Sequence, residues 1–283
     1  MASVKFTKMN GLGNDFVILD YSEYERTQKS PSELARILCD RNFGIGADGL
    51  IIVNPTCKNA DISWIFYNSD GSVAQMCGNG MRCFARYVYD KKLIDKKEFS
   101  VETKAGIIIP KIISDTEVRV NMGQPILNPE KIPCNSEFNL NIPYSIGEEK
   151  FSLNTVSMGN PHCIIFVEKD SKALALKYGA TIETDALFPE KTNVEFVEIL
   201  SRDEVVINVW ERGCGITLAC GTGACATTVA GIMRGHLNNK VKANLPGGSL
   251  QIEWSGSNSD TQHNVYMTGR ADYSFVGEFY LNE

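Results

Sequence analysis

Two cysteines stand in nearly identical surroundings, each followed by a Gly-x-Gly turn. Cys77 begins the run Cys-Gly-Asn-Gly and Cys220 begins Cys-Gly-Thr-Gly, 143 residues later (220 − 77). Apolar residues recur at helical spacing in the segments that follow, 78–90 and 221–234, so each cysteine is expected at the start of a helix. The N–H groups of a first helical turn and the positive end of the helix dipole attract an anion. Each turn could therefore bind a carboxylate and present a sulfur beside it.

The pairing of these sulfurs predicts a particular reaction. The field at a helix N-terminus favours thiolate over thiol, so we expect the pKa of both thiols to lie below the usual value of about 8.5. A substrate carbon between two such sulfurs could lose its proton to one and gain a proton from the other on the opposite side. The helix N-termini would stabilise the charge that builds on the neighbouring carboxylate. The pattern predicts a two-base inversion of a stereocentre that requires no cofactor.

The remaining cysteines have contexts typical of packing rather than chemistry. The chain has no C-x-x-C pair and three histidines, so no metal site is expected. Neither glycine-rich turn has the spacing of a phosphate-binding or dinucleotide-binding loop. Nine cysteines in 283 residues are too few for a disulfide framework, which favours reduced thiols and a cytoplasmic location. The cysteines assigned to packing are Cys39, Cys57, Cys83, Cys134, Cys163, Cys214 and Cys225.

Composition excludes several classes of partner. The chain carries 28 Lys and Arg against 34 Asp and Glu, a net charge of −6, which predicts no affinity for nucleic acid or an anionic membrane surface. No apolar run approaches the roughly 20 residues of a membrane-spanning helix, and the first residues lack the apolar core of a secretory signal. We expect a protein that acts on a small molecule.

Short β-rich segments outnumber helical ones, which predicts an α+β fold. Helices are expected at 31–39, 78–90, 173–179 and 221–234. Strands are expected at 15–19, 50–53, 62–67, 118–121, 162–167, 193–199, 205–210, 250–254 and 265–268.

Several landmarks repeat in register and indicate an internal duplication. Asn14 precedes Cys77 by 63 residues, and Asn160 precedes Cys220 by 60. Asn68 and Glu211 each end a strand-like run nine residues before the respective cysteine. Glycine and prolines at 123–133 break any regular element between the copies. We expect one half at 1–122, completed by a C-terminal strand at 272–283, and a second half at 123–271.

With these motifs the sequence resembles the diaminopimelate epimerase family nearly end to end. The resemblance lies in seven runs that occur in the family's order: MNGLGNDFVILD, NSDGSVAQMCGNGMRCFARYV, VRVNMGQP, VSMGNPH, NVEFVEI, ERGCGITLACGTGACA and LPGGSLQIEW. It implies a pyridoxal-phosphate-independent isomerase that interconverts LL- and meso-diaminopimelate in lysine and cell-wall precursor synthesis. It also implies two pseudo-symmetric domains, each a barrel-like, mainly antiparallel sheet around a central helix, with the site in the cleft between them. The resemblance further implies a homodimer with a small-molecule substrate.

The resemblance also assigns roles to residues. Cys77 and Cys220 would be the thiol/thiolate acid–base pair, and His162 and Glu211 would assist their ionisation or receive the substrate ammonium. Backbone amides at the two helix starts would bind the carboxylate next to the reacting carbon, and Arg212 would bind the distal one. The substrate-binding residues are expected to be Asn14, Asn68, Gly78, Asn79, Asn160, Asn193, Glu211, Arg212, Gly221 and Thr222.

One position departs from the family's pattern, and two other functions compete. Many members carry glutamine where this chain has Gly49, so that side-chain contact is absent or supplied from elsewhere. A proline racemase type of enzyme would share the two cysteines, but that group typically has histidine in place of Asn79 and needs no arginine for a distal carboxylate. A thiol redox or binding protein would use the two sulfurs alone and leave the surrounding polar residues unexplained.

Overall fold

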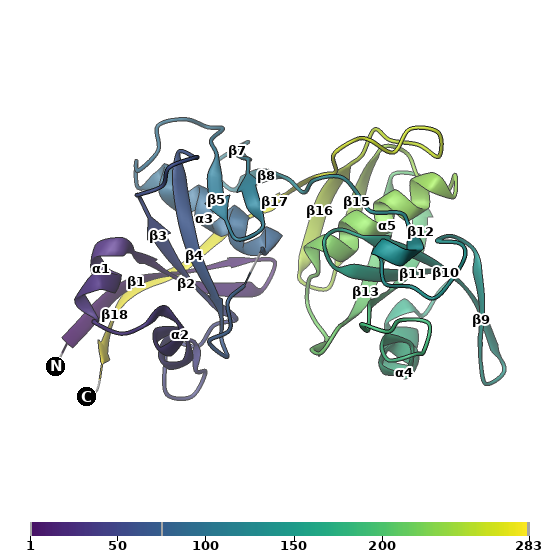
Figure 1. Cartoon of the computed structure of the whole chain (residues 1–283), viewed down its shortest axis with the longest axis horizontal. Helices are drawn as coiled ribbons and strands as arrows, with labels where there is room; N and C mark the ends of the chain where they lie inside the picture. Colours follow the sequence, from purple (N-terminus) through teal and green to yellow (C-terminus); the bar gives the residue numbers. More distant parts are fainter. Residues whose placement is uncertain (1, 75, 282–283) are drawn as a thin grey trace. The chain divides into compact units, whose positions relative to one another are not determined.

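A computed structural model describes residues 2–74 and 76–281, and the chain divides into two compact units. Unit 1 spans residues 1–120 and 269–283, and unit 2 spans residues 121–268. Figure 1 shows the strands and helices of each unit. In the described part of the chain, no helix is long and apolar enough to cross a membrane.

Unit 1 is built on a sheet with the strand order β18-β1-β2-β3-β4-β5-β6. Of the C-terminal strand expected at 272–283, residues 272–281 form β18, while residues 282–283 lie outside the described part. The elements are β1 (Ala2–Gly11), β2 (Asn14–Asp20), α1 (Tyr21–Arg26), α2 (Pro31–Cys39), β3 (Gly49–Asn54), β4 (Ile62–Asn68), α3 (Gly78–Asp90), β5 (Val101–Thr103), β6 (Gly106–Ile108), β7 (Pro110–Ile112), β8 (Glu117–Asn121) and β18 (Asp272–Leu281).

Unit 2 contains a longer sheet in which β17-β16-β15-β13-β12-β11-β10-β9 are successive neighbours and β14 pairs with β13. The unit boundaries fall within β8 and β17. The elements are a 3₁₀ turn η1 (Pro129–Lys131), β9 (Ile142–Ile146), β10 (Glu149–Ser157), β11 (Pro161–Val167), α4 (Ser171–Glu183), β12 (Asn193–Ser201), β13 (Glu204–Glu211), β14 (Gly215–Ile216), α5 (Gly221–Met233), β15 (Lys240–Leu245), β16 (Gly248–Glu253) and β17 (Tyr266–Arg270).

The two units repeat one topology. From β1 to β6, successive strand pairs are antiparallel, parallel, antiparallel, parallel and antiparallel. The same alternation runs through β10, β11, β12, β13, β15 and β16. Helices α2 and α4 connect the first parallel pair of each unit, and α3 and α5 connect the second. The predicted pseudo-symmetric α+β fold is confirmed.

Each sheet curves around one helix without closing into a barrel among the described strands. In unit 1, α3 contacts β1, β2, β3 and β7. In unit 2, α5 contacts both β10 and β16, which lie far apart in the strand order, so the sheet must bend around the helix. Figure 1 shows α5 among these strands. The helix that begins at each cysteine is therefore the central helix of its unit.

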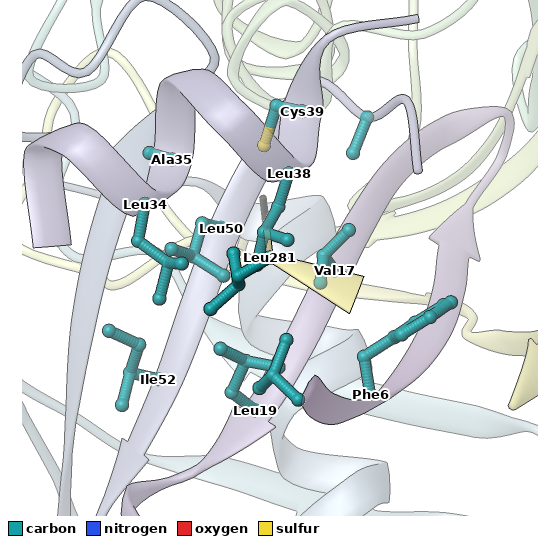
Figure 2. Close-up of a cluster of buried hydrophobic side chains, with 12 residues drawn as sticks. Phe6, Val17, Leu19, Leu34, Ala35, Leu38, Cys39, Leu50, Ile52 and Leu281 are labelled. Atoms are coloured by element: carbon teal, nitrogen blue, oxygen red, sulfur yellow. The ribbon is translucent and has the colours of Figure 1, made fainter. Parts of the chain in front are cut away.

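A second layer covers the outer face of each sheet. In unit 1, Leu34 and Leu38 of α2 pack against Leu50 of β3 and Val17 of β2 (Figure 2). Pro31 occupies the first turn of α2, and the Ser30 hydroxyl accepts a hydrogen bond from the N–H of Glu33, so the sequence caps this helix locally. In unit 2, α4 plays the same part against β12 and β13. Both faces of the central strands are thus buried, which fixes their register.

Candidate active site

Both cysteines cap the helices that follow them. Cys77 has φ −145° and ψ 116°, Cys220 has φ −112° and ψ 105°, and both conformations are extended. Each sulfur accepts a hydrogen bond from the N–H three residues on, Gly80 or Gly223, at 3.4 Å. The predicted helix starts at Gly78 and Gly221 are confirmed. Each sulfur therefore lies over the first turn of a helix, where Gly78, Asn79, Gly221 and Thr222 also lie.

In unit 1, Asn14 links the sulfur to the helix start. Its Oδ1 accepts a hydrogen bond from Asn79 Nδ2 at 3.1 Å and lies 3.5 Å from the Cys77 sulfur, which donates. Asn14 is itself held by Asp48, whose Oδ2 accepts a hydrogen bond from Asn14 Nδ2 at 2.6 Å. Three residues from the predicted site, Asn14, Cys77 and Asn79, are thus brought together.

Asp48 belongs to a charged cluster that the sequence analysis did not identify. Arg41 binds both Asp48, at 2.7 Å, and Asp15, at 2.9 Å, while Lys8 binds Asp15 at 2.8 Å. Burial acts to raise the pKa of Asp15, but its hydrogen bonds from Arg41 and Lys8 outweigh burial and hold that pKa below its usual value. Arg41 thereby holds Asp48, which in turn binds the Asn14 side chain at the start of β2.

Asn68 and Gly49 lie opposite each other on neighbouring strands of unit 1. The Asn68 side chain is exposed and donates to Ser72 Oγ at 2.9 Å. A side chain at position 49 would start 2.7 Å from the ring of Phe66 and 2.8 Å from the carbonyl of Tyr67. A side chain at position 49 would therefore require the Phe66 ring and the Tyr67 backbone to shift.

In unit 2, a continuous set of hydrogen bonds surrounds the second sulfur. Thr222 Oγ1 lies 3.5 Å from the Cys220 sulfur and accepts a hydrogen bond from Asn160 Nδ2 at 3.3 Å. Asn160 Oδ1 lies 3.1 Å from His162 Nε2. The opposite ring nitrogen, Nδ1, lies 2.7 Å from Glu195 Oε1. His162 is thus fixed from both sides.

Glu195 is the residue of this site that the sequence analysis missed. It lies within β12, where its neighbours Val194 and Phe196 are buried in the core, and it is itself fully buried. The signal was present, because a carboxylate in a fully buried strand must be paired. The ligand atoms of His162, Glu195 and Cys220 all lie within 4.8 Å of one another.

The same three side chains could in principle bind a metal ion such as zinc. In the structure, however, His162 and Glu195 are bonded directly to each other at 2.7 Å. A zinc ion between them would require each to turn toward the metal at about 2.0–2.2 Å. We interpret the group as a hydrogen-bonded acid–base cluster.

The remaining predicted residues of unit 2 lie at the ends of β12 and β13. Asn193 Nδ2 donates to the carbonyl of Pro161 at 2.8 Å, and its Oδ1 accepts from the N–H of Arg212 at 2.9 Å. The exposed Arg212 guanidinium donates to the carbonyl of Glu190 at 3.1 Å. Glu211 Oε1 accepts a hydrogen bond from Thr217 Oγ1. Asn193 thereby fixes the backbone from which Arg212 extends.

The pKa of Cys220 does not follow the sequence-based expectation. Burial raises the pKa of this thiol well above its usual range, and the negative charges of Glu211 and Glu195 raise it further. The hydrogen bonds from Thr222 and from the N–H of Gly223 act in the opposite direction and do not compensate. The prediction of a lowered pKa is wrong for Cys220, because the helix field is weaker than desolvation together with two nearby carboxylates. The raised pKa favours the thiol form of Cys220, which can donate a proton.

Comparisons with known proteins agree with this geometry. A sequence model of the family described as diaminopimelate epimerase matches residues 6–128 and 154–274. The chain is 52% identical over 280 residues to the diaminopimelate epimerase of Carboxydothermus hydrogenoformans, covering 98% of this chain and 100% of the relative. It is 44% identical over 287 residues to the chloroplastic diaminopimelate epimerase of Oryza sativa, covering 97% and 80% respectively.

The chain belongs to the diaminopimelate epimerase family. It is therefore an isomerase, and specifically an epimerase.

Solved structures show how far this family's fold extends. A hydroxyproline epimerase from Agrobacterium vitis superposes with a TM-score of 0.69 at 12% identity, over 100% of this chain and 94% of its own. A probable proline racemase from Agrobacterium radiobacter gives a TM-score of 0.69 at 15% identity, over 99% and 93%. At these identities the likeness establishes the two-unit fold alone. The diaminopimelate epimerase family thus shares its architecture with other racemases and epimerases.

Proposed function

We propose that this epimerase interconverts LL-2,6-diaminopimelate and meso-2,6-diaminopimelate by inverting one α-carbon, with Cys77 and Cys220 as its two acid–base groups. The observation that carries the proposal is the matched pair of cysteine caps, one on the central helix of each unit. In this proposal one sulfur acts on each face of the reacting carbon. The chemistry requires no cofactor, since both proton transfers use side chains of the chain itself.

The helix starts would bind the carboxylate attached to that carbon. Backbone N–H groups of Gly78, Asn79, Gly221 and Thr222 lie in the first turns of α3 and α5, where N–H groups have no acceptor within the helix. As the α-proton leaves, negative charge spreads onto the carboxylate, and these dipoles stabilise it without reorganising. This contribution grows in the transition state, which makes it catalytic rather than merely binding.

The resting thiol of Cys220 sets the direction in which the reaction starts. In the form of the enzyme that reacts in this direction Cys220 is a thiol, and Cys77, whose thiol donates to Asn14 Oδ1 in the structure, has first lost its proton to solvent. Cys77 then removes the α-proton, and Cys220 delivers its proton to the opposite face. One cycle leaves the sulfurs with exchanged protonation, ready for the reverse inversion. His162 would assist this exchange, and Glu211, whose negative charge opposes a thiolate at Cys220, would receive the substrate ammonium.

The far end of the substrate would be held by Arg212 and neighbouring amides. The backbone of Arg212 is fixed by Asn193, and its guanidinium is exposed, so its fork of donors can bind a second carboxylate in bidentate fashion. Asn14, Asn68 and Asn160 supply further polar contacts. A substrate with a second carboxylate would use the Arg212 guanidinium in this way, whereas proline has no second carboxylate to bind there.

This activity places the enzyme in lysine and cell-wall precursor synthesis. Its thiols need a reducing compartment, and its composition is that of a cytoplasmic enzyme with a small-molecule substrate. Neither nucleic acid nor membrane is among the proposed partners.

The experiment that tests the proposal compares two substrates under reducing conditions. Purified enzyme is incubated with LL-diaminopimelate or with L-proline, and the stereoisomers are separated by chiral chromatography. We expect meso-diaminopimelate and no D-proline. Racemised proline with unchanged diaminopimelate would support the competing racemase function, and two unchanged substrates would contradict both.

We also propose that the enzyme is a homodimer, as the family resemblance implies. β18 is the edge strand of its sheet, and it exposes Phe275, Val276 and Tyr280. An exposed apolar edge strand is typical of a surface that pairs with another chain. Size-exclusion chromatography with light scattering should give a dimer for the native enzyme and a monomer for Val276→Lys. A monomeric native enzyme would contradict this proposal.

A further inference from the structure

Asp48 lies where three segments of unit 1 meet. Its backbone N–H donates to the carbonyl of Asp15, in β2, at 2.9 Å, and its carbonyl accepts a hydrogen bond from the N–H of Ser69, after β4, at 3.1 Å. Its side chain accepts from the N–H of Asp15 at 3.0 Å and from Arg41 at 2.7 Å. The position of this carboxylate is therefore fixed by backbone contacts as well as by an ion pair.

This carboxylate determines which way the Asn14 amide points. Asn14 Nδ2 lies 2.6 Å from Asp48 Oδ2. A carboxylate only accepts hydrogen bonds, so the end of the amide that faces Asp48 must be the nitrogen. The amide oxygen then faces the opposite side, where it accepts from Asn79 Nδ2 at 3.1 Å and from the Cys77 thiol at 3.5 Å. The amide cannot turn over without placing its oxygen against the carboxylate.

The second unit has the opposite amide direction at the matching position. Asn160 corresponds to Asn14 in the duplication, and the helix residue that binds each amide lies two residues after its cysteine. In unit 1 this helix residue, Asn79, donates to the Asn14 oxygen. In unit 2 it is Thr222, whose Oγ1 instead accepts from Asn160 Nδ2 at 3.3 Å. The start of α3 thus faces an amide oxygen, and the start of α5 faces an amide nitrogen.

The residue in the position of Asp48 also differs between the units. The parallel strand pairs β2–β3 and β11–β12 place Gly49 and Asn193 at matching positions. The residue before each is Asp48 in unit 1 and Thr192 in unit 2. Thr192 carries no charge, and its hydroxyl donates to the carbonyl of Asn193 at 3.1 Å. The reversed amide thus coincides with the absence of a carboxylate at this position, which supports Asp48 as the group that orients Asn14.

The direction of the amide matters for the strength of the base at Cys77. An amide oxygen beside the sulfur stabilises the thiol, which donates to it, and does not stabilise the thiolate. A thiolate without such stabilisation binds a proton more tightly, so it is the stronger general base for a weakly acidic carbon. At Cys220, burial and then the nearby carboxylates raise the pKa of the thiol. Cys77 is only partly buried, so its polar contacts contribute more to its basicity.

We propose that Asp48 is a positioning residue, which holds the Asn14 amide with its oxygen toward Cys77 and so keeps this sulfur a strong proton acceptor. The proposal rests on the proposed function, in which Cys77 is one of the two acid–base groups. Asp48 acts through Asn14 and needs no contact with the substrate.

Alkylation of Cys77 tests the proposal without substrate. The enzyme is treated with iodoacetamide over a range of pH and digested with trypsin, and mass spectrometry follows the peptide 59–82, whose single cysteine is Cys77. In Asp48→Asn the new side chain has one oxygen, which Arg41 binds, so its NH2 group faces Asn14 and turns that amide over. The Asn14 nitrogen then stabilises the thiolate. We expect the alkylation midpoint to fall by about 0.5–1 pH unit, and an unchanged or higher midpoint would overturn the proposal.

A second background separates the orientation of the amide from the loss of a negative charge, which also lowers the midpoint. In Asn14→Ala no amide is left to turn, so adding Asp48→Asn should shift the midpoint by less than half as much as it does in the native enzyme. Equal shifts in the two backgrounds would show that Asp48 acts by charge alone and would overturn the proposal. Every variant keeps the charged side chains on the elements around this pair, which are Lys8, Asp15, Arg41 and Arg82.

Two further variants complete the set. Asp48→Glu keeps an acceptor and should leave the midpoint closer to the native value than Asp48→Asn does. Asp40→Asn is the matched control in the same loop, because it removes one negative charge from a side chain that binds the N–H groups of Asn42 and Phe43. It should leave the midpoint unchanged, and a shift as large as that of Asp48→Asn would overturn the proposal.

The same digest reports whether each variant is folded. Cys83 is fully buried, and burial raises the pKa of its thiol to about 12, so it should stay unmodified in folded protein. Turnover adds the link to catalysis: kcat with LL-diaminopimelate should fall about tenfold in Asp48→Asn, because Cys77 becomes a weaker base. Native enzyme that shows the expected alkylation shifts yet leaves diaminopimelate unchanged would contradict the proposed function and leave the orienting role of Asp48 standing.

Discussion

At the scale of single residues, the two cysteines could be predicted from the sequence, but the direction of the pKa shift of Cys220 could not. The identical contexts of Cys77 and Cys220 marked them, and both cap helices as expected. Burial is the largest cause that raises the pKa of Cys220, and the carboxylates of Glu211 and Glu195, from two neighbouring strands, raise it further. The spacing of residues along the chain predicts where a helix begins. It does not predict which residues are buried or which charged groups lie on neighbouring strands.

A residue-scale prediction concerns Gly80 and Gly223, each of which lies three residues after one of the two cysteines. Gly223→Ala would place a methyl group 2.5 Å from Glu195 Oε1 and 3.2 Å from the Cys220 sulfur, so it must displace the acid–base cluster. Gly80→Ala meets its neighbours at 3.4 Å, which is close to ordinary contact. We expect Gly223→Ala to lower kcat by at least about tenfold and to reduce the free energy of unfolding by about 1–3 kcal/mol.

Gly80→Ala is the internal control for this prediction. It should change the free energy of unfolding by less than about 1 kcal/mol, because alanine also favours the helix. Epimerase assays and urea titrations of both variants provide the measurement. Equal losses of kcat and of unfolding free energy in Gly80→Ala and Gly223→Ala would contradict the prediction that only the second glycine is tightly surrounded.

At the scale of elements, the helices other than α1 were predictable from periodicity, but the strands β1, β5, β6, β7, β9, β10, β14 and β15 were not. The helices at 31–39 and 78–90 have the predicted ends, and the helix expected at 173–179 extends over 171–183. Strands β1 and β10 were missed because they bury polar side chains, such as Lys8 in β1 and Asn154 in β10, which break the expected alternation. Lys8 is buried through its ion pair with Asp15, and Asn154 through a hydrogen bond to Ile164.

The cysteine caps lead to an element-scale prediction. Cys220→Ser keeps an acceptor for the N–H of Gly223, and serine is among the best helix caps, whereas Cys220→Ala loses this bond. Both variants should lose epimerase activity by at least about 100-fold, because neither alcohol nor methyl replaces the thiol. Urea unfolding should show the serine variant more stable than the alanine variant by about 0.5–2 kcal/mol. Equal stabilities would show that the cap contributes nothing to α5.

At the scale of the whole molecule, the duplication was visible in three pairs of landmarks and is borne out by matching strand pairings in the two units. The sequence comparison of the halves did not reveal that Phe16 and Ile51 correspond to His162 and Glu195. That correspondence depends on the register of two parallel strand pairs, which no local motif encodes. The two units are alike in topology and differ in the side chains that lie near the first turn of the central helix.

The most direct test of the two-base mechanism is the fate of the α-hydrogen in deuterated water. Enzyme and unlabelled LL-diaminopimelate are mixed under reducing conditions, and product and remaining substrate are analysed by mass spectrometry at low conversion. Because different sulfurs remove and deliver the proton, the meso product should carry one solvent deuterium while the remaining substrate stays unlabelled. A meso product that retains the original hydrogen, or substrate labelled as fast as product, would contradict the assignment of one sulfur to each face.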